Sequence, residues 1–446
     1  MHVVDANSLY SSIASQMELP VGKYEIWTDL SMLQLIEYKK ESHAHFYKGE
    51  EMIGIALVEM KSPFEGIPFI GIQCDNRYIY TLCAECAKSE SKKNCRHGDI
   101  KRNILATLTW PEINFMVGFL GFKLISIFET YQWKQKANFF QKFLKVLEHF
   151  KLRAEKPQVG KSPEDFCQDM NKANQFENEL ELSPALLKPN ASMRKTYKEV
   201  LCSILGKMAQ INSKTNCKVI KSQSSLTSLF YSPESKIDDI FAVGKACLVI
   251  TSPKKLRKPT VNKKSSMIVY AYITAQSRIF MHQKMMDLRR MSCRLIALSN
   301  DCLYFVASLN VTLPFEIGKH FGTFKHEYNP NHIKAYLSFG MKFTSLYLSG
   351  DNGTFETVIK ARGFCLKTAL IKEALNFPAL LNSFYDTQCK SIVIPQIRKR
   401  KILPTTASYV KKQAFHLKTN IISPYLIDEN WSTTAIGSRI LSNSKK

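Results

Sequence analysis

The pattern of apolar and polar positions predicts short strands joined by loops over residues 1–60. We expect a turn at Val21-Gly22 and a buried strand from Gly54 to Val58. Over residues 133–151, apolar side chains recur at positions i, i+3, i+4 and i+7 with polar residues between them. This spacing predicts a helix, because residues with these separations share one helical face.

Two further helices have clear starting signals. Ser162 precedes Pro163, Glu164 and Asp165, which places a capping residue before a proline and acids in the first turn. Asn190 likewise precedes a helical pattern of roughly 20 residues that runs through Asn212. Together with residues 133–151, these segments predict a helical hairpin.

Later in the chain, residues 266–287 read as an apolar helix. Residues 294–307 consist of two short apolar runs separated by Ser-Asn-Asp-Cys, which predicts a β-hairpin with Asp301 at its tip. Taken alone, an aspartate in such a place is usually only a turn former. Residues 346–446 mix strands with a helix and end in basic segments.

Length and charge place this chain among globular proteins with a polyanionic partner. Its 446 residues, 45% hydrophobic and 11% aromatic, suffice for two or more subdomains. Lysine and arginine, 62 in all, exceed the 38 acidic residues and give a net charge of +24. Such an excess favours nucleic acid or phosphates as partners, and the alternative is a solvated basic surface.

The sequence predicts no membrane partner. Asp5 interrupts the short apolar stretch at the N-terminus, which argues against a signal peptide. No apolar run reaches the roughly 18 residues that a membrane span requires. The 12 cysteines without a secretory signal favour reduced thiols. We therefore expect an intracellular, reducing compartment, with the nucleus as one option.

Four potential metal ligands lie close together in a polar segment. They follow the pattern Cys83-x2-Cys86-x8-Cys95-x-His97. Three thiols and one imidazole at this spacing suit a closed, tetrahedral, structural Zn²⁺ site. Unrelated free thiols are the alternative.

A second group of residues has the composition that two-metal phosphoryl transfer requires. Asp5 ends an apolar run and is followed by a small polar turn and Tyr10, which suits a metal-binding carboxylate at a strand end. The chemistry also needs a second carboxylate on a neighbouring hairpin and cations for the triphosphate. Asp301 supplies the second carboxylate. The cations are supplied by Arg194 and Lys198, which lie on one face of a predicted helix. An ordinary amphipathic helix with exposed lysines is the alternative for the helix.

These segments resemble, in order, the three polymerase motifs of family B DNA polymerases. Residues 5–10 (DANSLY) resemble motif A, DxxSLYP. Lys198, Ser203 and Gly206 match motif B, KxxxNSxYG, and residues 298–305 (LSNDCLYF) resemble motif C, YxDTDSxxF. The cysteine-rich segment resembles the C-x2-C…C-x-H region of protein-primed polymerases from Polinton/Maverick transposons.

The resemblance implies roles for individual residues. Asp5 and Asp301 would be catalytic and would bind two Mg²⁺ ions, or Mn²⁺. Residues for the incoming dNTP would be Ser8, Leu9, Tyr10, Arg194 and Lys198, with Tyr10 packing on the sugar. Lys360 and Arg362 would contact DNA, and Cys83, Cys86, Cys95 and His97 would bind the structural zinc.

Several family positions are changed in this chain. Cys202 and Leu205 replace the asparagine and the aromatic residue of motif B. Ser299 replaces the first aspartate of motif C, and Asn352 stands where the family has a lysine. These replacements lie around metal, sugar and primer end, so weak or absent activity is expected.

The fold implied is α+β with a right-hand polymerase architecture: an antiparallel-sheet palm, helical-hairpin fingers, a mixed thumb and a small Cys/His insert. The expected divisions are palm with motif A at 1–70, insert at 71–132, fingers at 133–215, palm with motif C at 216–345 and thumb at 346–446.

The implied function is that of a DNA-directed DNA polymerase core, with a DNA primer-template and dNTPs as partners. Because the sequence begins at motif A, we expect a truncated gene, a partial sequence or a domesticated remnant, with a terminal protein or a separately encoded exonuclease region as further partners. A DNA-binding remnant without effective catalysis is the main alternative. A zinc-stapled interaction module is a third reading, which leaves the ordered motifs unexplained.

Overall fold

The computed structural model has a mixed α and β fold with antiparallel sheets, as predicted. It describes residues 1–74, 77–89, 95–157, 160–176, 178–209, 216–220, 222–233, 235–243, 246–253, 266–308, 311–338, 343–350, 352–361, 376–385, 390–399, 406–415, 425–427 and 433–435. The chain divides into two compact units. The first comprises Met1–Ile13, Val21–Lys136 and Ala275–Lys446, and the second comprises Ala14–Pro20 and Ala137–Thr274.

The first unit contains a four-stranded antiparallel sheet in which the N-terminal strand is internal. Its order is β14 (Arg294–Ser299), β15 (Cys302–Val306), β1 (His2–Ala6) and β16 (Phe324–His326). Val3, Val4 and Ala6 are buried, so both faces of β1 are covered. The β14–β15 pair confirms the predicted hairpin, and Asn300 makes its turn with a φ of 57°.

A second sheet carries the largest apolar core of the unit. Its order is β2 (Leu19–Trp27), β10 (Lys123–Ala137), β6 (Gly54–Lys61) and β9 (Ile104–Thr109). Side chains of β6 alternate between buried and half-buried, because successive residues of a strand point to opposite faces. Helix α5 (Trp110–Phe119) packs on the buried face and begins with a capping box between Thr109 and Glu112.

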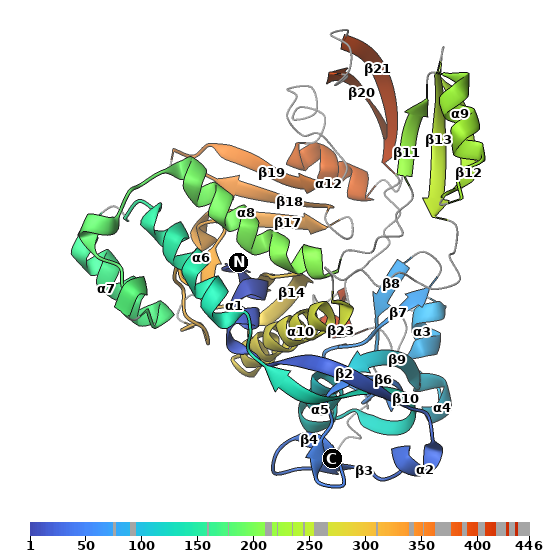
Figure 1. Cartoon of the computed structure of the whole chain (residues 1–446). Helices are drawn as coiled ribbons and strands as arrows, with labels where there is room; N and C mark the ends of the chain where they lie inside the picture. Colours follow the sequence, from blue (N-terminus) through green and yellow to red (C-terminus); the bar gives the residue numbers. More distant parts are fainter. Residues whose placement is uncertain are drawn as a thin grey trace. The chain divides into compact units, whose positions relative to one another are not determined.

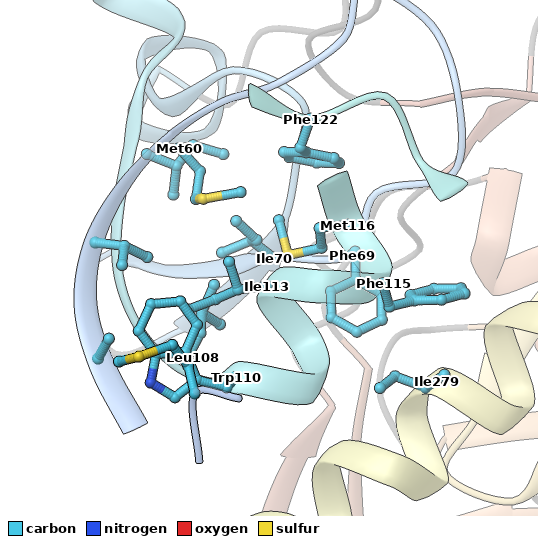
Figure 2. Packing of buried hydrophobic residues seen from close by; sticks show 14 of the residues in the cluster. Met60, Phe69, Ile70, Leu108, Trp110, Ile113, Phe115, Met116, Phe122 and Ile279 are labelled. Carbon is cyan, nitrogen blue, oxygen red and sulfur yellow. The ribbon is translucent and has the colours of Figure 1, made fainter. Parts of the chain in front are cut away.

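Figure 2 shows how this core is filled. Aliphatic and sulfur-containing side chains from β6, β9 and α5 meet the aromatic rings of Phe69 and Phe115, and Ile279 of α10 (Met267–Arg290) packs against them. The indole nitrogen of Trp110 donates to Thr130 Oγ1 at 3.2 Å, so the buried ring has a polar partner.

Smaller elements complete the first unit. Its other sheets are β3 (Ile36–Lys39), β4 (Ala44–Tyr47) and β5 (Glu50–Glu51); β7 (Gly71–Cys74) and β8 (Arg77–Tyr80); β17 (Ile333–Ser338), β18 (Phe343–Ser349) and β19 (Phe355–Ala361); β20 (Lys390–Lys399) and β21 (Thr406–Phe415); β22 (Tyr425–Ile427) and β23 (Thr433–Ala435). Its helices include α2 (Leu30–Leu33), α3 (Ala84–Lys88), α4 (Asp99–Arg102) and α12 (Phe377–Tyr385), and α1 (Leu9–Gln16) begins within it.

The second unit holds the helices of the predicted hairpin. They are α6 (Gln141–Arg153), α7 (Pro163–Asn174) and α8 (Ala191–Met208). Ser162 and Asn190 cap α7 and α8 by accepting backbone N–H groups, as predicted. The N–H of Asn190 donates to the carbonyl of Ala154 at 3.0 Å, so α8 starts where α6 ends and the two run antiparallel (Figure 1).

The same unit contains a three-stranded sheet of order β11 (Asn216–Ile220), β13 (Ala246–Pro253) and β12 (Ser235–Val243). Helix α9 (Gln223–Phe230) packs on it through Leu229, which meets Ile220 and Val249. Among the helices of the described ranges, none combines the length and the apolar character that crossing a membrane requires.

Two local predictions were wrong. The helix expected over residues 133–151 begins only at Gln141, because residues 133–137 belong to strand β10. The backbone N–H of Trp133 donates to the carbonyl of Ile53 at 2.9 Å, so pairing between distant segments overrides the local helical period. The expected turn at Val21-Gly22 lies inside β2; Gly22 has a φ of 84°, but the strand continues through it.

The core position Ile113 should be sensitive to truncation. Because its side chain is fully buried, Ile113→Ala is expected to lower the free energy of unfolding by about 2–5 kcal/mol. Urea unfolding followed by tryptophan fluorescence measures this, since Trp110 lies in the same cluster. The control is Leu105→Ala on β9, where 60% of the side chain is exposed and a change within about 0.5 kcal/mol is expected. Equal effects of the two substitutions would contradict the assigned packing.

Candidate functional site

Strand β1 brings Asp5 next to two other strands. In the sheet register, Asp5 is opposite Cys302 of β15 and opposite Lys325 of β16. The N–H of Ala6 donates to the carbonyl of Asp301 at 2.9 Å. The two aspartates predicted to be catalytic are therefore held at one end of the same sheet, by backbone hydrogen bonds.

A loop from later in the sequence clamps the turn after Asp5. The Asn7 side-chain amide donates to the carbonyl of Gly318 at 2.8 Å and to Thr323 Oγ1 at 3.2 Å. The Asn7 backbone N–H donates to the carbonyl of Thr323 at 2.8 Å. Ser8 has a φ of 48° and Leu9 is buried at the start of α1. Tyr10, on the first turn of α1, is half-buried.

Asp301, like Asp5, is partly buried. Burial raises its pKa above the usual value, and the nearby negative charge of Asp5 raises it further. Cys302, on the strand beside Asp5, is also buried, and this burial raises its pKa to about 12. The thiol is therefore neutral at physiological pH and adds no charge to the site.

Lys325 and Glu327, which were given no role from the sequence, complete this group together with Lys360, which was predicted to contact DNA. Lys325 Nζ lies 2.9 Å from Asp5 Oδ2 and 3.5 Å from Glu327 Oε1. Lys360 Nζ lies 3.3 Å from Glu327 Oε2 and above the ring of Tyr328. Partial burial acts to lower the pKa of Lys325, but the hydrogen bond and charge of Asp5 outweigh it and raise the pKa. The sequence offered only the two-residue spacing of Lys325 and Glu327, which places their side chains on one face of an extended segment.

We call Asp5, Asp301, Lys325, Glu327 and Lys360 the charged cluster. Its carboxylate oxygens are the hard ligands that Mg²⁺ and Mn²⁺ prefer. Magnesium in phosphoryl-transfer sites is usually bound by one or two protein carboxylates, with water and substrate phosphates as its other ligands. Asp5 and Asp301 fit this donor set, and they would hold such an ion.

Helix α8 of the second unit carries the residues predicted to bind the triphosphate. Arg194 Nη2 lies 3.1 Å from Oε1 of Glu155, which is almost fully buried. Lys198 lies one helical turn later, exposed and without an ion pair in the part of the chain that the structure describes. Phe150 of α6 stacks on Tyr197 and fixes this end of α8.

The remaining predicted DNA-binding and primer-end positions lie around β19. Lys360 is on β19 and belongs to the charged cluster. Asn352 is exposed in the turn between β18 and β19, which Gly350 closes by donating its N–H to the carbonyl of Thr354 at 2.7 Å. Arg362 lies outside the described residues, as do Asp351 and the basic segment 254–264.

The structure brings together the four predicted zinc ligands. The ligand atoms of Cys83, Cys86, Cys95 and His97 all lie within 4.8 Å of one another. His97 Nδ1 is 3.4 Å from the sulfurs of Cys83 and Cys86 and 3.7 Å from that of Cys95. Tetrahedral zinc, with bonds of about 2.0–2.3 Å, separates its ligand atoms by about 3.5–3.8 Å. This group could therefore bind a zinc ion.

A buried arginine supports an anionic sulfur at Cys95. The Arg102 side chain is fully buried; its Nη1 donates to Cys95 Sγ at 3.0 Å and its Nη2 to the carbonyl of Pro63 at 2.7 Å. Burial acts to raise the pKa of Cys95, but hydrogen bonds from His97 and the neighbouring thiols outweigh it and lower the pKa to about 7. A buried cation that contacts one of three clustered sulfurs fits a metal-bound group better than unrelated thiols.

The fold is similar to that of phi29 DNA polymerase. The structure of that polymerase with primer-template DNA and incoming nucleotides has a TM-score of 0.55 at 12% sequence identity. It matches over 94% of this chain and 57% of the polymerase. The complexes with primer-template DNA alone and with single-stranded DNA give TM-scores of 0.52 and 0.51, also at 12% identity.

This chain spans little more than half the length of the polymerase it matches. No family model and no curated protein matches the sequence. At this identity the similarity shows the fold alone.

The Cys/His group should make zinc a stoichiometric component. Purified protein is expected to carry about one Zn²⁺ per chain, and Cys86→Ser should remove most of it because a neutral hydroxyl is a poor fourth ligand. Elemental analysis measures the ion, and Cys202→Ser, at an exposed cysteine on α8, is the matched control. Zinc-free protein in which every thiol reacts freely would exclude the site.

Proposed function

We propose that this chain is the polymerase core of a family B DNA polymerase, which adds nucleotides from dNTPs to a DNA 3′-OH and releases pyrophosphate. One observation carries the proposal: in a fold similar to phi29 DNA polymerase, Asp5 of β1 and Asp301 of the β14–β15 hairpin lie at one end of a single sheet. The net charge of +24 supports a polyanionic partner.

Asp5 and Asp301 would hold the divalent ion, Mg²⁺ or Mn²⁺. When bound, such an ion activates the 3′-OH and stabilises charge on the reacting phosphate. The backbone amides at Ser8 and Leu9 would bind the triphosphate of the dNTP, and Tyr10 would pack on its sugar. The clamp by Asn7 supports this role, because it fixes the turn that carries those amides.

Lys198 and Arg194 would neutralise the triphosphate. Lys198 is already exposed and unpaired among the described residues. Arg194 has Glu155 as its partner at 3.1 Å, so it would have to exchange this carboxylate for a phosphate. An arginine with an almost buried acidic partner contributes less to nucleotide affinity than a free one, because the partner's charge must then be left uncompensated.

Finer parts of the proposal rest on the sequence. The five-part division into palm, insert, fingers and thumb follows the order of the motifs. Protein priming, with a terminal protein and an exonuclease region as partners, follows from the resemblance to Polinton/Maverick polymerases. Lys360 and Arg362 would contact DNA, although Lys360 would first have to leave Glu327.

A DNA-binding remnant with weak catalysis is the second candidate, and the Asp5–Lys325 ion pair favours it. An ammonium already neutralises the carboxylate that the reaction needs. Ser299, Cys202, Leu205 and Asn352 each replace a group of the family motifs. Losing one preorganised group in a comparable site costs about 10²–10³ in rate, and such losses are not additive.

Primer extension tests the two candidates. Purified protein is mixed with a labelled primer-template and dNTPs in Mg²⁺ or Mn²⁺, beside an Asp301→Ala control. We expect extension that is weak, stronger with Mn²⁺ and absent in the control, because Asp301 is needed to bind the ion. Fluorescence anisotropy on the same DNA should show affinity falling steeply with salt, since binding releases counterions.

The outcomes separate the two candidates. Extension that Asp301→Ala abolishes would support the polymerase core, and robust extension of this kind would also reject the remnant. Equal traces in both proteins, with salt-dependent DNA binding intact, would reject catalysis and leave the remnant. A binding constant independent of salt would contradict both.

A further inference from the structure

The geometry points to Lys325 as a built-in cation that competes with the divalent metal for Asp5, so that the charged cluster binds one ion weakly instead of two tightly. This inference rests on the proposed function, since it concerns the metal that Asp5 and Asp301 would hold. It assigns to Lys325 a positioning and regulatory role that no residue of the three polymerase motifs has.

The position of Lys325 is fixed by the sheet. Residue 325 is directly opposite residue 5 in the β1–β16 register, so the two side chains leave the sheet on the same face. Lys325 Nζ contacts Asp5 Oδ2 at 2.9 Å, and both side chains are partly shielded from water, with exposures of 39% and 22%. The ammonium thus occupies one of the two oxygens that Asp5 offers to a metal.

The charges of the cluster leave little capacity for metal. When all are ionised, Asp5, Asp301 and Glu327 contribute three negative charges. Lys325 and Lys360 contribute two positive charges, which leaves one negative charge. Two divalent ions would add four positive charges to this small, half-buried volume. This arrangement therefore tolerates at most one divalent ion, accompanied by the negative phosphates of a substrate.

Glu327 gives the ammonium an alternative partner. Lys325 Nζ is already 3.5 Å from Glu327 Oε1, and Glu327 is anchored because its N–H donates to the carbonyl of Val3 at 2.9 Å. A metal that binds Asp5 would displace Lys325 toward Glu327 without leaving the ammonium unpaired. Lys360, which also contacts Glu327, opposes this movement through like-charge repulsion, so displacement has a cost.

The inference predicts that removing the charge of Lys325 strengthens metal binding. Mn²⁺ is titrated into the full chain without DNA or dNTPs, and free Mn²⁺ is measured by electron paramagnetic resonance. Lys325→Met keeps the apolar stem and should bind Mn²⁺ about tenfold tighter than the wild type, because a unit charge a few ångströms from the ion is gone. Lys325→Arg, which keeps the charge, should stay near the wild-type affinity.

Two controls assign the effect to this site. Lys334→Met removes an exposed lysine of β17, the next strand along the chain, and should leave Mn²⁺ affinity unchanged, which excludes an effect of net charge. Asp301→Asn should weaken binding in both the wild type and Lys325→Met. If Lys325→Met does not fold, as judged by circular dichroism, Lys325→Gln serves as the second neutral variant.

Equal or weaker Mn²⁺ binding by the folded neutral variants would overturn the role of Lys325. If Asp301→Asn still weakened Mn²⁺ binding in that case, the proposed metal site would stand, but Lys325 would have no role in it. If Asp301→Asn leaves the Mn²⁺ affinity unchanged in every variant, or if no Mn²⁺ binds at all, both the role of Lys325 and the proposed site are overturned.

Discussion

The internal position of strand β1 is the constraint on which the rest of the candidate site depends. A strand of five residues pairs on one side with β15 and on the other with β16. This pairing joins the first residues of the chain to segments some three hundred positions later, and it brings Asp5 beside Asp301, Lys325 and Glu327. Buried valines on β1 hold it there, because fully burying a valine side chain contributes about 1.5–3 kcal/mol. Without this pairing the four charged residues would have no common location.

The charged cluster combines features of a reactive site with features of a neutralised one. Burial raises the pKa of Asp301, and such carboxyl groups are typical of functional sites. Lys325 works in the opposite direction, since it pairs with the Asp5 carboxylate that a metal would otherwise use. Arg194 shows the same tendency in the second unit, where Glu155 holds the cation expected at the triphosphate. A polymerase fold whose key charges are paired internally would be slow to load metal and nucleotide, which agrees with the altered motif positions.

Much of the fold and of the candidate site could be predicted from the sequence where the signal is local. Ser162 and Asn190 cap their helices as expected, the 294–307 hairpin forms with Asp301 in its turn, and the four zinc ligands meet. The predictions failed where contacts between segments far apart in the sequence determine the local structure. Residues 133–137 have a helical period but belong to strand β10, where the Trp133 N–H donates to the carbonyl of distant Ile53. Likewise, nothing near Lys325 in the sequence indicates that Asp5 is its neighbour. Register between strands far apart in the chain is set by tertiary packing, which a one-dimensional pattern does not contain.

The pairing of β1 with β15, which brings Asp5 beside Asp301, is tested most directly by disulfide trapping between the two strands. Asp5 and Cys302 form a non-hydrogen-bonded pair, because the neighbouring Ala6 N–H donates to the Asp301 carbonyl. Cβ atoms in such pairs lie about 4.5–5.5 Å apart, close to the distance that a disulfide spans. Mild oxidation of Asp5→Cys should therefore link residues 5 and 302, as read by peptide mass spectrometry. Val4→Cys, which faces the other side of the sheet, should not form this link. Absence of the 5–302 bond in folded protein, or equal linkage from position 4, would contradict the arrangement that joins Asp5 to Asp301.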